Sequence, residues 1–171
     1  MSETDTILAI STPAGYSLRA VIRLSGDQAL ETVGERFVPD ESGRNWRRTY
    51  TCSAGRLVLD GGTLDLPVRL YVMRAPRSYT REDVAEVHLP GSPALLDVVL
   101  DELLAAGGEA VRLARPGEFT QRAFLNGRID LAQAEAVNEI IVGSNALQVH
   151  AAQRLLTGRV SEQLHRWQED L

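Results

Sequence analysis

Cysteine is nearly absent from this 171-residue chain, and Cys52 alone cannot form an intramolecular disulfide. A single thiol is typical of a protein kept in a reducing compartment, so we expect a cytoplasmic location. Apolar runs are short, and none approaches the roughly 20 residues that a membrane-spanning helix requires. The first ten residues, MSETDTILAI, lack the basic and apolar segments of a signal peptide. We therefore expect no association with a membrane.

Several chemical motifs are missing as well. Neither GxxxxGK[ST] nor GxGxxG occurs, so we expect no P-loop and no bound nucleotide in this chain. The three histidines, His88, His150 and His165, are far apart in the sequence, and we expect no metal site. Cys52 falls within a strand pattern without an activating neighbour, so we predict no catalytic nucleophile.

Positive charge is not in excess either. The formal net charge is -5 and the pI is about 5.2, which argues against a protein that coats nucleic acid. No direct nucleic-acid site is evident, although a local basic pocket remains compatible with this balance. Hydrophobic residues make up 44% of the chain, as is usual for a globular protein. The length fits one domain, or one domain with a helical appendage.

The first part of the chain is rich in strand patterns. Strands are predicted over residues 6–11, 19–25, 49–59, 64–73, 84–89 and 110–113. The Asp60-Gly61-Gly62 turn joins two of them into a hairpin. One helix is predicted over residues 27–37, capped by Asp27. A second begins after Ser92, with Leu95, Leu96, Val99, Leu103 and Leu104 as its apolar stripe.

After Arg115 the pattern becomes wholly helical. A short helix is predicted over residues 118–125 and ends at Asn126-Gly127. Asp130 and Gln133 have the spacing of a capping box, which begins a helix that runs to about residue 142. A last helix, with Ser144 as its expected cap, runs to the C-terminus. We therefore predict an α/β domain over residues 1–116 and a helical segment over residues 117–171.

A few charged residues stand where apolar or neutral ones would suffice. Arg23 and Glu86 each lie inside an apolar strand, and Arg122 and Arg128 flank the break at Asn126-Gly127. Each alone is compatible with a solvated sheet face or a helix end. Together they suit a ligand with an acidic tail for the arginines and a donor-bearing, pterin-like edge for the carboxylate.

The segment RPGEFTQRAFLNGRIDLAQAEA, residues 115–136, resembles the signature of the MnmE (TrmE) family. Members of this family are GTPases that help to modify the wobble uridine of certain tRNAs. DTILAISTPAG, VIRLSG, SYTREDVAEVHLPG and HAAQRLLTGRVSEQL resemble further family segments in the same order. The resemblance covers nearly the whole chain but only the front of the family's architecture, before the GTPase domain. The family's C-terminal cysteine motif is absent, and Cys52 does not match it.

The resemblance implies an α+β fold with a mixed sheet, similar to the tetrahydrofolate-binding part of the glycine-cleavage T protein, followed by a helical segment. It also implies binding of 5-formyl- or methylene-tetrahydrofolate, which donates a one-carbon unit. The family's folate-contacting positions fall on Arg23, Glu86 and Arg128, where the last replaces a family lysine. A homodimer is implied, together with a tRNA modification partner subunit in a full-length member. Arg115 and Arg122 are expected to be structural or surface charges.

Two loops differ from the family pattern. The stretch GYSLRA, residues 15–20, replaces a glycine-rich segment, and HLPGSP, residues 88–93, replaces a His-Gly-Gly-like turn. These differences motivate an alternative, a divergent standalone interaction module that has lost folate binding. A third reading, a folate-dependent aminomethyl transferase, rests on fold analogy alone. In every reading the chain itself carries no GTPase motif.

Overall fold

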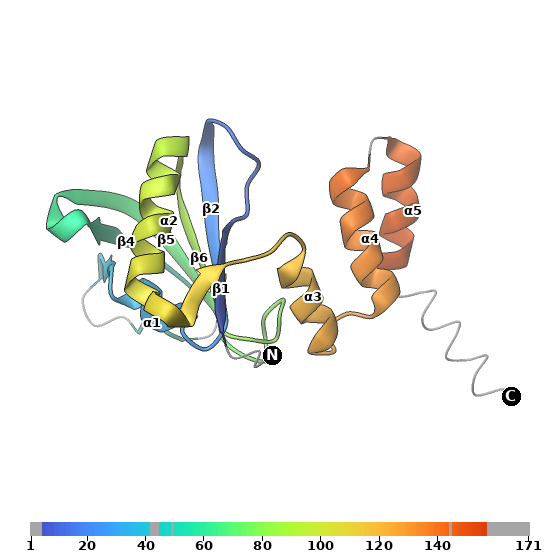
Figure 1. The fold of residues 1–171 in the computed structure, drawn as a ribbon, viewed down its shortest axis with the longest axis horizontal. Helices are drawn as coiled ribbons and strands as arrows, with labels where there is room; N and C mark the ends of the chain where they lie inside the picture. The colour runs from blue at the N-terminus through green and yellow to red at the C-terminus, as the bar shows by residue number, and fades with distance from the viewer. Residues whose placement is uncertain (1–4, 42–44, 49, 144, 157–171) are drawn as a thin grey trace, which may run out of the picture. The chain divides into compact units, whose positions relative to one another are not determined.

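The computed structural model describes residues 5–41, 45–48, 50–143 and 145–156. The chain divides into two compact units, Met1–Arg115 and Pro116–Leu171. The first unit combines a sheet with two helices, and the second is helical (Figure 1). Among the described helices, none is long and apolar enough to cross a membrane.

A seven-stranded mixed sheet forms the centre of the first unit, in the order β3-β4-β5-β6-β2-β1-β7. All neighbouring strands are antiparallel except β1 and β7, which are parallel. The strands span Thr6–Ile10 (β1), Ser17–Ser25 (β2), Phe37–Pro39 (β3), Thr51–Leu59 (β4), Leu64–Met73 (β5), Val84–Gly91 (β6) and Val111–Leu113 (β7). The predicted α+β class with a mixed sheet is confirmed.

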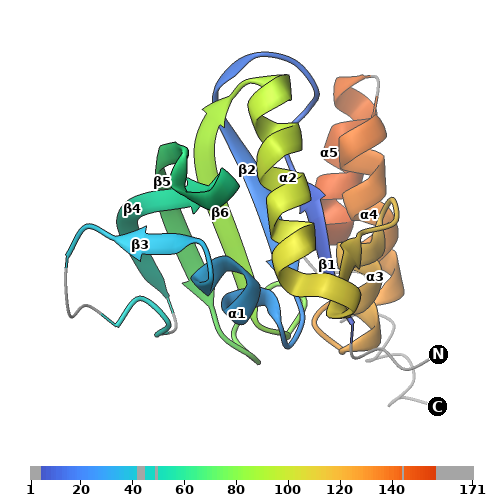
Figure 2. The ribbon, with the colours of Figure 1, turned by 60° about the vertical axis from the view of Figure 1, so that its left-hand side comes forward.

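Two helices, α1 (Ala29–Gly34) and α2 (Pro93–Gly107), lie on the same side of this sheet (Figure 2). The core forms between them and alternate strand residues, because successive side chains of a strand point to opposite faces. Ile22, Leu24, Leu57, Leu70 and Val87 are completely buried there. The predicted stripe of α2 is confirmed, with Leu96, Val99 and Leu103 buried and Leu95 and Leu104 packed beside them.

The predicted helix over residues 27–37 is wrong at both ends. The helix α1 covers only Ala29–Gly34, and Gln28, not Asp27, occupies its N-cap position. Phe37 belongs to β3, where it pairs with Leu57 of β4. Its ring is buried over Gly55, and a side chain at position 55 would lie 2.5 Å from that ring. A long-range strand pairing thus overrides the helical spacing that includes Phe37.

The hairpin around Asp60-Gly61-Gly62 is confirmed, since Leu59 pairs with Leu64 across a 3-10 turn, η1 (Asp60–Gly62). A second short turn, η2 (Gly108–Ala110), leads into β7. Ser92 occupies the predicted N-cap position of α2, but its hydroxyl makes no capping hydrogen bond.

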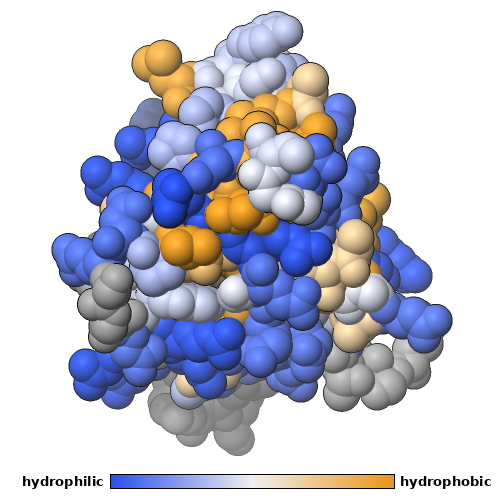
Figure 3. Space-filling model, turned by 90° about the vertical axis from the view of Figure 1, so that its left-hand side faces the viewer, coloured by the Kyte–Doolittle hydropathy of each residue, from blue (hydrophilic) through white to orange (hydrophobic). Residues whose placement is uncertain are grey.

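The side of the molecule in Figure 3 is largely hydrophilic, with hydrophobic residues gathered near its middle and upper part.

The second unit contains α3 (Glu118–Leu125), α4 (Leu131–Val142) and α5 (Ala146–Leu156). The first two have the predicted bounds, and the capping box between Asp130 and Gln133 is confirmed in both directions. The apolar stripe of α5 includes Ala152, which is buried. The predicted cap Ser144, the C-terminal extension of this helix and His165 lie outside the described residues.

Candidate functional site

The face of the sheet turned away from α1 and α2 carries the charged side chains. Strand register sets them in rows across β2, β6, β5 and β4. One row reads Arg23, Glu86, Tyr71 and Cys52, and the next reads Val21, His88, Arg69 and Ala54. Directly opposed side chains in antiparallel strands lie about 5 Å apart at Cβ, so each row is a set of potential contacts.

Arg23 and Glu86, two of the three predicted site residues, form an ion pair. The Nε atom of Arg23 donates to Oε1 of Glu86 at 2.7 Å, and the side chains are 30% and 19% exposed. Both backbones are fixed by the β2–β6 ladder, in which the two residues are direct partners. The hydrogen bond between them is therefore charge-assisted. It joins two strands, and the pair is accessible from the open face of the sheet, the one turned away from α1 and α2.

Glu86 has a second neighbour in His88. The Nε2 atom of His88 lies 3.3 Å from Oε2 of Glu86, so the carboxylate bridges a guanidinium and an imidazole. The His88 ring also lies against Tyr71, with ring centroids 4.5 Å apart and an angle of 45° between the planes. The Nδ1 atom of His88 is buried and has no hydrogen-bond partner among the described residues.

Tyr71 connects this cluster to Cys52 on β4. A side-chain hydrogen bond with Cys52 raises the pKa of Tyr71 above its ordinary value, and the negative charge of the thiolate and partial burial act in the same direction. The positive charges of Arg69 and Arg19 lower the pKa of Tyr71 and oppose this effect. Cys52 itself is half-buried in a strand, as the sequence predicts.

The third predicted site residue, Arg128, belongs to the second unit and is exposed. It follows a left-handed Gly127, whose φ is 67° and whose N–H donates to the carbonyl of Phe124. The Arg128 N–H donates to the carbonyl of Ala123 at 2.8 Å. These two bonds form a Schellman motif, which fixes the backbone of Arg128 just beyond α3.

The other two arginines of this segment have different surroundings. Arg122 is buried and pairs with Glu118 one helical turn earlier, with 3.4 Å between Nη2 and Oε1. This arrangement agrees with the structural role expected for Arg122. Arg115 is exposed at the end of the first unit.

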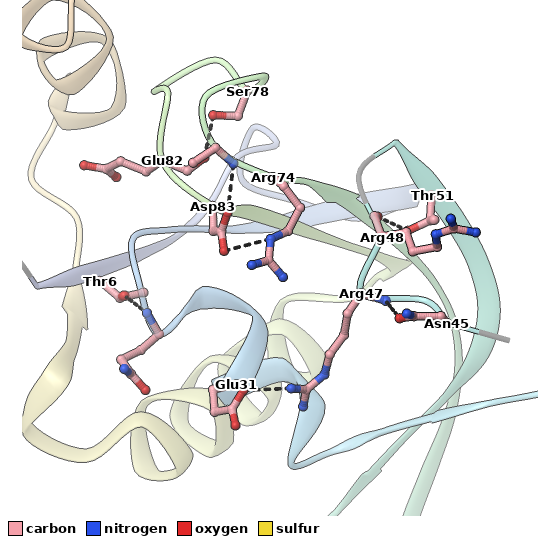
Figure 4. Close-up of polar contacts among 12 residues, drawn as sticks. Thr6, Glu31, Asn45, Arg47, Arg48, Thr51, Arg74, Ser78, Glu82 and Asp83 are labelled. Carbon is pink, nitrogen blue, oxygen red and sulfur yellow. Dashed lines mark hydrogen bonds and ion pairs between the residues drawn. The ribbon is translucent and has the colours of Figure 1, made fainter. Parts of the chain in front are cut away.

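The loop between β5 and β6 is held against the end of β2. Arg74 and Asp83 form an ion pair at 3.1 Å, and the Ser78 hydroxyl donates to the carbonyl of Glu82 (Figure 4). The Ser25 hydroxyl, two residues beyond Arg23, lies 2.6 Å from the Thr80 hydroxyl and donates to Glu82 at 2.7 Å. The loop is thereby fastened to the end of β2.

Comparison with known proteins assigns the chain to a family. The family described as "GTP-binding protein TrmE N-terminus" matches residues 6–128, which is more than half of the chain. The chain belongs to this family. The tRNA modification GTPase MnmE of Roseiflexus sp. is 45% identical over 162 residues, covering 95% of this chain and 34% of that protein. The MnmE proteins of Geobacillus kaustophilus and Oceanobacillus iheyensis are 44% and 40% identical, covering 95% and 100% of this chain and 35% and 36% of theirs.

This member of the TrmE N-terminal family thus spans about a third of the length of the curated relatives it matches. The resemblance found in the sequence is confirmed, as is its limitation to the N-terminal region.

Among the described residues, no group of three His, Cys, Asp or Glu side chains could hold a metal ion.

Sequence reasoning missed several members of the charged face. Arg69 and Tyr71 alternate with the buried Val68, Leu70 and Val72, so their outward direction was readable from the period-2 pattern. The sequence did not show that these two residues lie beside His88 and Glu86, because cross-strand register depends on turns and bulges far along the chain.

Proposed function

We propose that this chain is the tetrahydrofolate-binding and dimerisation module of a tRNA modification GTPase. On this proposal the sheet has a fold similar to that of the glycine-cleavage T protein. The module would hold 5-formyl- or methylene-tetrahydrofolate as the one-carbon donor. The observation that carries the proposal is the half-buried Arg23–Glu86 pair on the open face of the sheet.

The Arg23–Glu86 ion pair can still bind a ligand. An ionised carboxylate has roughly four lone-pair positions, so Glu86 can accept from a ligand while it accepts from Arg23. A pterin presents neighbouring N–H and amino donors, which match a carboxylate held at a fixed angle. Arg23 neutralises Glu86, which lowers the cost of keeping a carboxylate half-buried beside an aromatic ligand.

Arg128 would supply positive charge to the acidic end of the ligand. Its side chain is exposed, and the Schellman motif fixes the backbone from which it extends. A guanidinium at this position keeps the charge of the family's lysine and adds the ability to bind a carboxylate with two parallel hydrogen bonds.

Dimerisation is supported by two exposed apolar side chains in the stretch of residues 15–20, which differs from the family pattern. Tyr16 is 88% exposed and Leu18 is 102% exposed, at the entrance to β2. Tyrosine and leucine in such positions are typical of a protein contact rather than of a solvated loop. A second copy of the chain would cover them. A full-length member would in addition have a tRNA modification partner subunit.

Calorimetry with 5-formyltetrahydrofolate tests this proposal. The wild-type chain should bind with saturable heat at about one ligand per chain. Arg23→Ala and Glu86→Gln should each weaken binding by roughly 10- to 100-fold, because each removes a charge-assisted hydrogen bond. Arg56→Ala is the matched control, since Arg56 lies on the same sheet face but pairs with Asp65.

The alternative function, a standalone interaction module without folate, predicts a different result. The exposed Tyr16 and Leu18 favour it as much as they favour a dimer. On this reading the chain would self-associate yet show no heat with folate at high micromolar concentration. That outcome would replace the folate-binding proposal.

A further inference from the structure

We propose that His88 is a positioning residue for the candidate folate site, and that its Nε2–H holds the Glu86 carboxylate in the orientation that a pterin requires. His88 acts through Glu86 and not by contact with the ligand. The inference rests on the proposed function, because it concerns the same carboxylate. It goes further by giving a defined role to a residue outside the three assigned to the ligand.

Each oxygen of the Glu86 carboxylate has a partner of its own. Oε1 accepts a hydrogen bond from Nε of Arg23 at 2.7 Å, and Oε2 lies 3.3 Å from Nε2 of His88. The contact with Arg23 alone would leave the plane of the carboxylate free to turn. Two contacts, one at each oxygen, fix this plane and with it the directions of the lone pairs that remain for a ligand.

The surroundings of the His88 ring decide which nitrogen carries the hydrogen. Nδ1 is buried and has no hydrogen-bond partner among the described residues, whereas Nε2 faces a carboxylate oxygen of Glu86. In a neutral imidazole only one nitrogen is a donor. A hydrogen on Nδ1 alone would leave a buried N–H unsatisfied and would set the lone pair of Nε2 against those of the carboxylate. The hydrogen therefore belongs on Nε2, as a donor to Glu86.

The His88 ring is itself held in place. It lies against the ring of Tyr71 with centroids 4.5 Å apart, and the His88 side chain is 18% exposed. Its backbone belongs to β6, the central strand of the seven, and is paired with Val21 on β2 and Arg69 on β5. Packing thus limits the rotamers of His88, which is the condition for a side chain that supports a binding group.

A role in packing alone makes a different prediction. The contact with Tyr71 could fill space on the sheet face without any use of the Nε2–H. In that case the shape of the side chain at position 88 would matter and its donor would not. Glutamine and leucine separate the two roles, because a glutamine side chain places an amide donor near the position of Nε2 and a leucine side chain has no donor.

Calorimetry with 5-formyltetrahydrofolate compares the whole chain with His88→Leu and His88→Gln. His88→Leu should bind roughly tenfold more weakly, because Glu86 loses the donor that fixes its orientation. His88→Gln should bind within about twofold of the wild type. Arg56→Ala, at an arginine that pairs with Asp65, is the control and should bind as the wild type does. Far-UV circular dichroism establishes that each variant is folded.

A second measurement needs no ligand. Hydrogen exchange of the Arg23 Nε–H, followed by NMR, reports how firmly Oε1 of Glu86 is held, since this hydrogen is protected by that oxygen. The exchange rate should rise roughly tenfold in His88→Leu and stay within about twofold of the wild-type rate in His88→Gln. A side chain that only fills space would not give this difference between the two variants.

The outcomes separate this inference from the proposed function. Unchanged affinity and unchanged exchange in His88→Leu overturn the positioning role and leave folate binding intact. Equal losses in His88→Leu and His88→Gln also overturn it, because the donor would then not matter. If the wild type binds no folate, the proposed function fails, and the exchange rates alone decide whether His88 holds Glu86.

Discussion

At the scale of single residues, Glu86 is the centre of the charged face. Its two carboxylate oxygens lie against Arg23 at 2.7 Å and His88 at 3.3 Å, and its cross-strand neighbour on β5 is Tyr71. A carboxylate held by one partner on the neighbouring strand β2 and by another two residues along β6 has little rotational freedom. Its remaining acceptor positions are therefore fixed in direction before a ligand arrives, which is the condition for specific recognition.

Replacing Cys52 by alanine should lower the pKa of Tyr71. The hydrogen bond with Cys52 favours the protonated phenol, so the pKa of Tyr71 lies above the ordinary value of about 10. The stabilisation from this bond is present below the ordinary pKa and is lost as pH rises through the raised pKa of the folded protein. NMR of ¹³C-labelled tyrosine across an alkaline titration measures the change.

The other tyrosine signals serve as internal controls in that titration, and Tyr71→Phe identifies the signal to follow. An unchanged or higher pKa of Tyr71 in Cys52→Ala would show that the contact with Cys52 does not govern this phenol.

At the scale of elements, the short strand β3 depends on one glycine. A side chain at position 55 would lie 2.5 Å from the carbonyl oxygen of Val38 and 2.5 Å from the ring of Phe37. The close approach of β3 to β4 is therefore possible only because position 55 has no Cβ. Phe37 gains its burial from this approach.

Gly55→Ala should destabilise the first unit by about 1–3 kcal/mol, since β3 must move outward or the Phe37 ring must leave its position. Urea denaturation followed by tryptophan fluorescence measures the effect, because Trp46 packs against Phe37 with ring centroids 5.4 Å apart. Ala54→Ser, at the exposed neighbouring position, is the control and should change stability by less than about 0.5 kcal/mol. Equal stability of the two variants would contradict the packing described for β3.

Asp130→Ala should destabilise α4 by about 0.5–2 kcal/mol, because it removes the side-chain acceptor for the Gln133 N–H, which lies 2.8 Å away. Thermal unfolding followed at 222 nm reports the loss. Glu139→Ala changes an exposed position of the same helix and should have a much smaller effect. A capping variant as stable as the wild type would show that α4 does not depend on this box.

Local signals in the sequence predicted the elements that are built locally. Asp60-Gly61-Gly62 predicted the hairpin, Asn126-Gly127 the end of α3, and Asp130 with Gln133 the start of α4. Each of these depends on residues a few positions apart. The spacing that placed Phe37 in a helix failed because its partner, Leu57, lies 20 positions further along the chain.

The contacts within the candidate site also depend on residues far apart in the sequence. The sequence marked Arg23 and Glu86 as charges inside apolar strands, and the structure shows that they are cross-strand partners. Their contact, and the rows that bring Tyr71 and Arg69 beside them, follow from register over 63 positions of sequence. Composition and periodicity contain no such information.

At the scale of the whole molecule, the chain has two compact units and belongs to a family whose curated members are about three times as long. Family membership and the α+β architecture follow from the comparisons and the structure. Folate binding and dimerisation are proposals. The charged sheet face supports the first, and the exposed Tyr16 and Leu18 side chains at the start of β2 support the second.

Sedimentation equilibrium tests the dimer. The wild-type chain, 18.7 kDa as a monomer, should sediment at about twice that mass at micromolar concentrations. Tyr16→Ser/Leu18→Ser should shift it toward the monomer, because the substitutions remove the exposed apolar contacts. Leu147→Ser, at another exposed apolar position, should leave the mass unchanged. A wild type that sediments as a monomer contradicts the proposed dimer.

We propose above all that a folate contacts the Arg23–Glu86 pair. The Nε–H resonance of Arg23 reports on this contact directly. In ¹⁵N-labelled protein, 5-formyltetrahydrofolate should shift that signal saturably, while the Nε–H signal of Arg56 stays in place. Arg23→Lys and Arg56→Lys assign the two signals by their disappearance. If the Arg23 signal does not move at saturating ligand, or moves no more than that of Arg56, the pair is not the folate site.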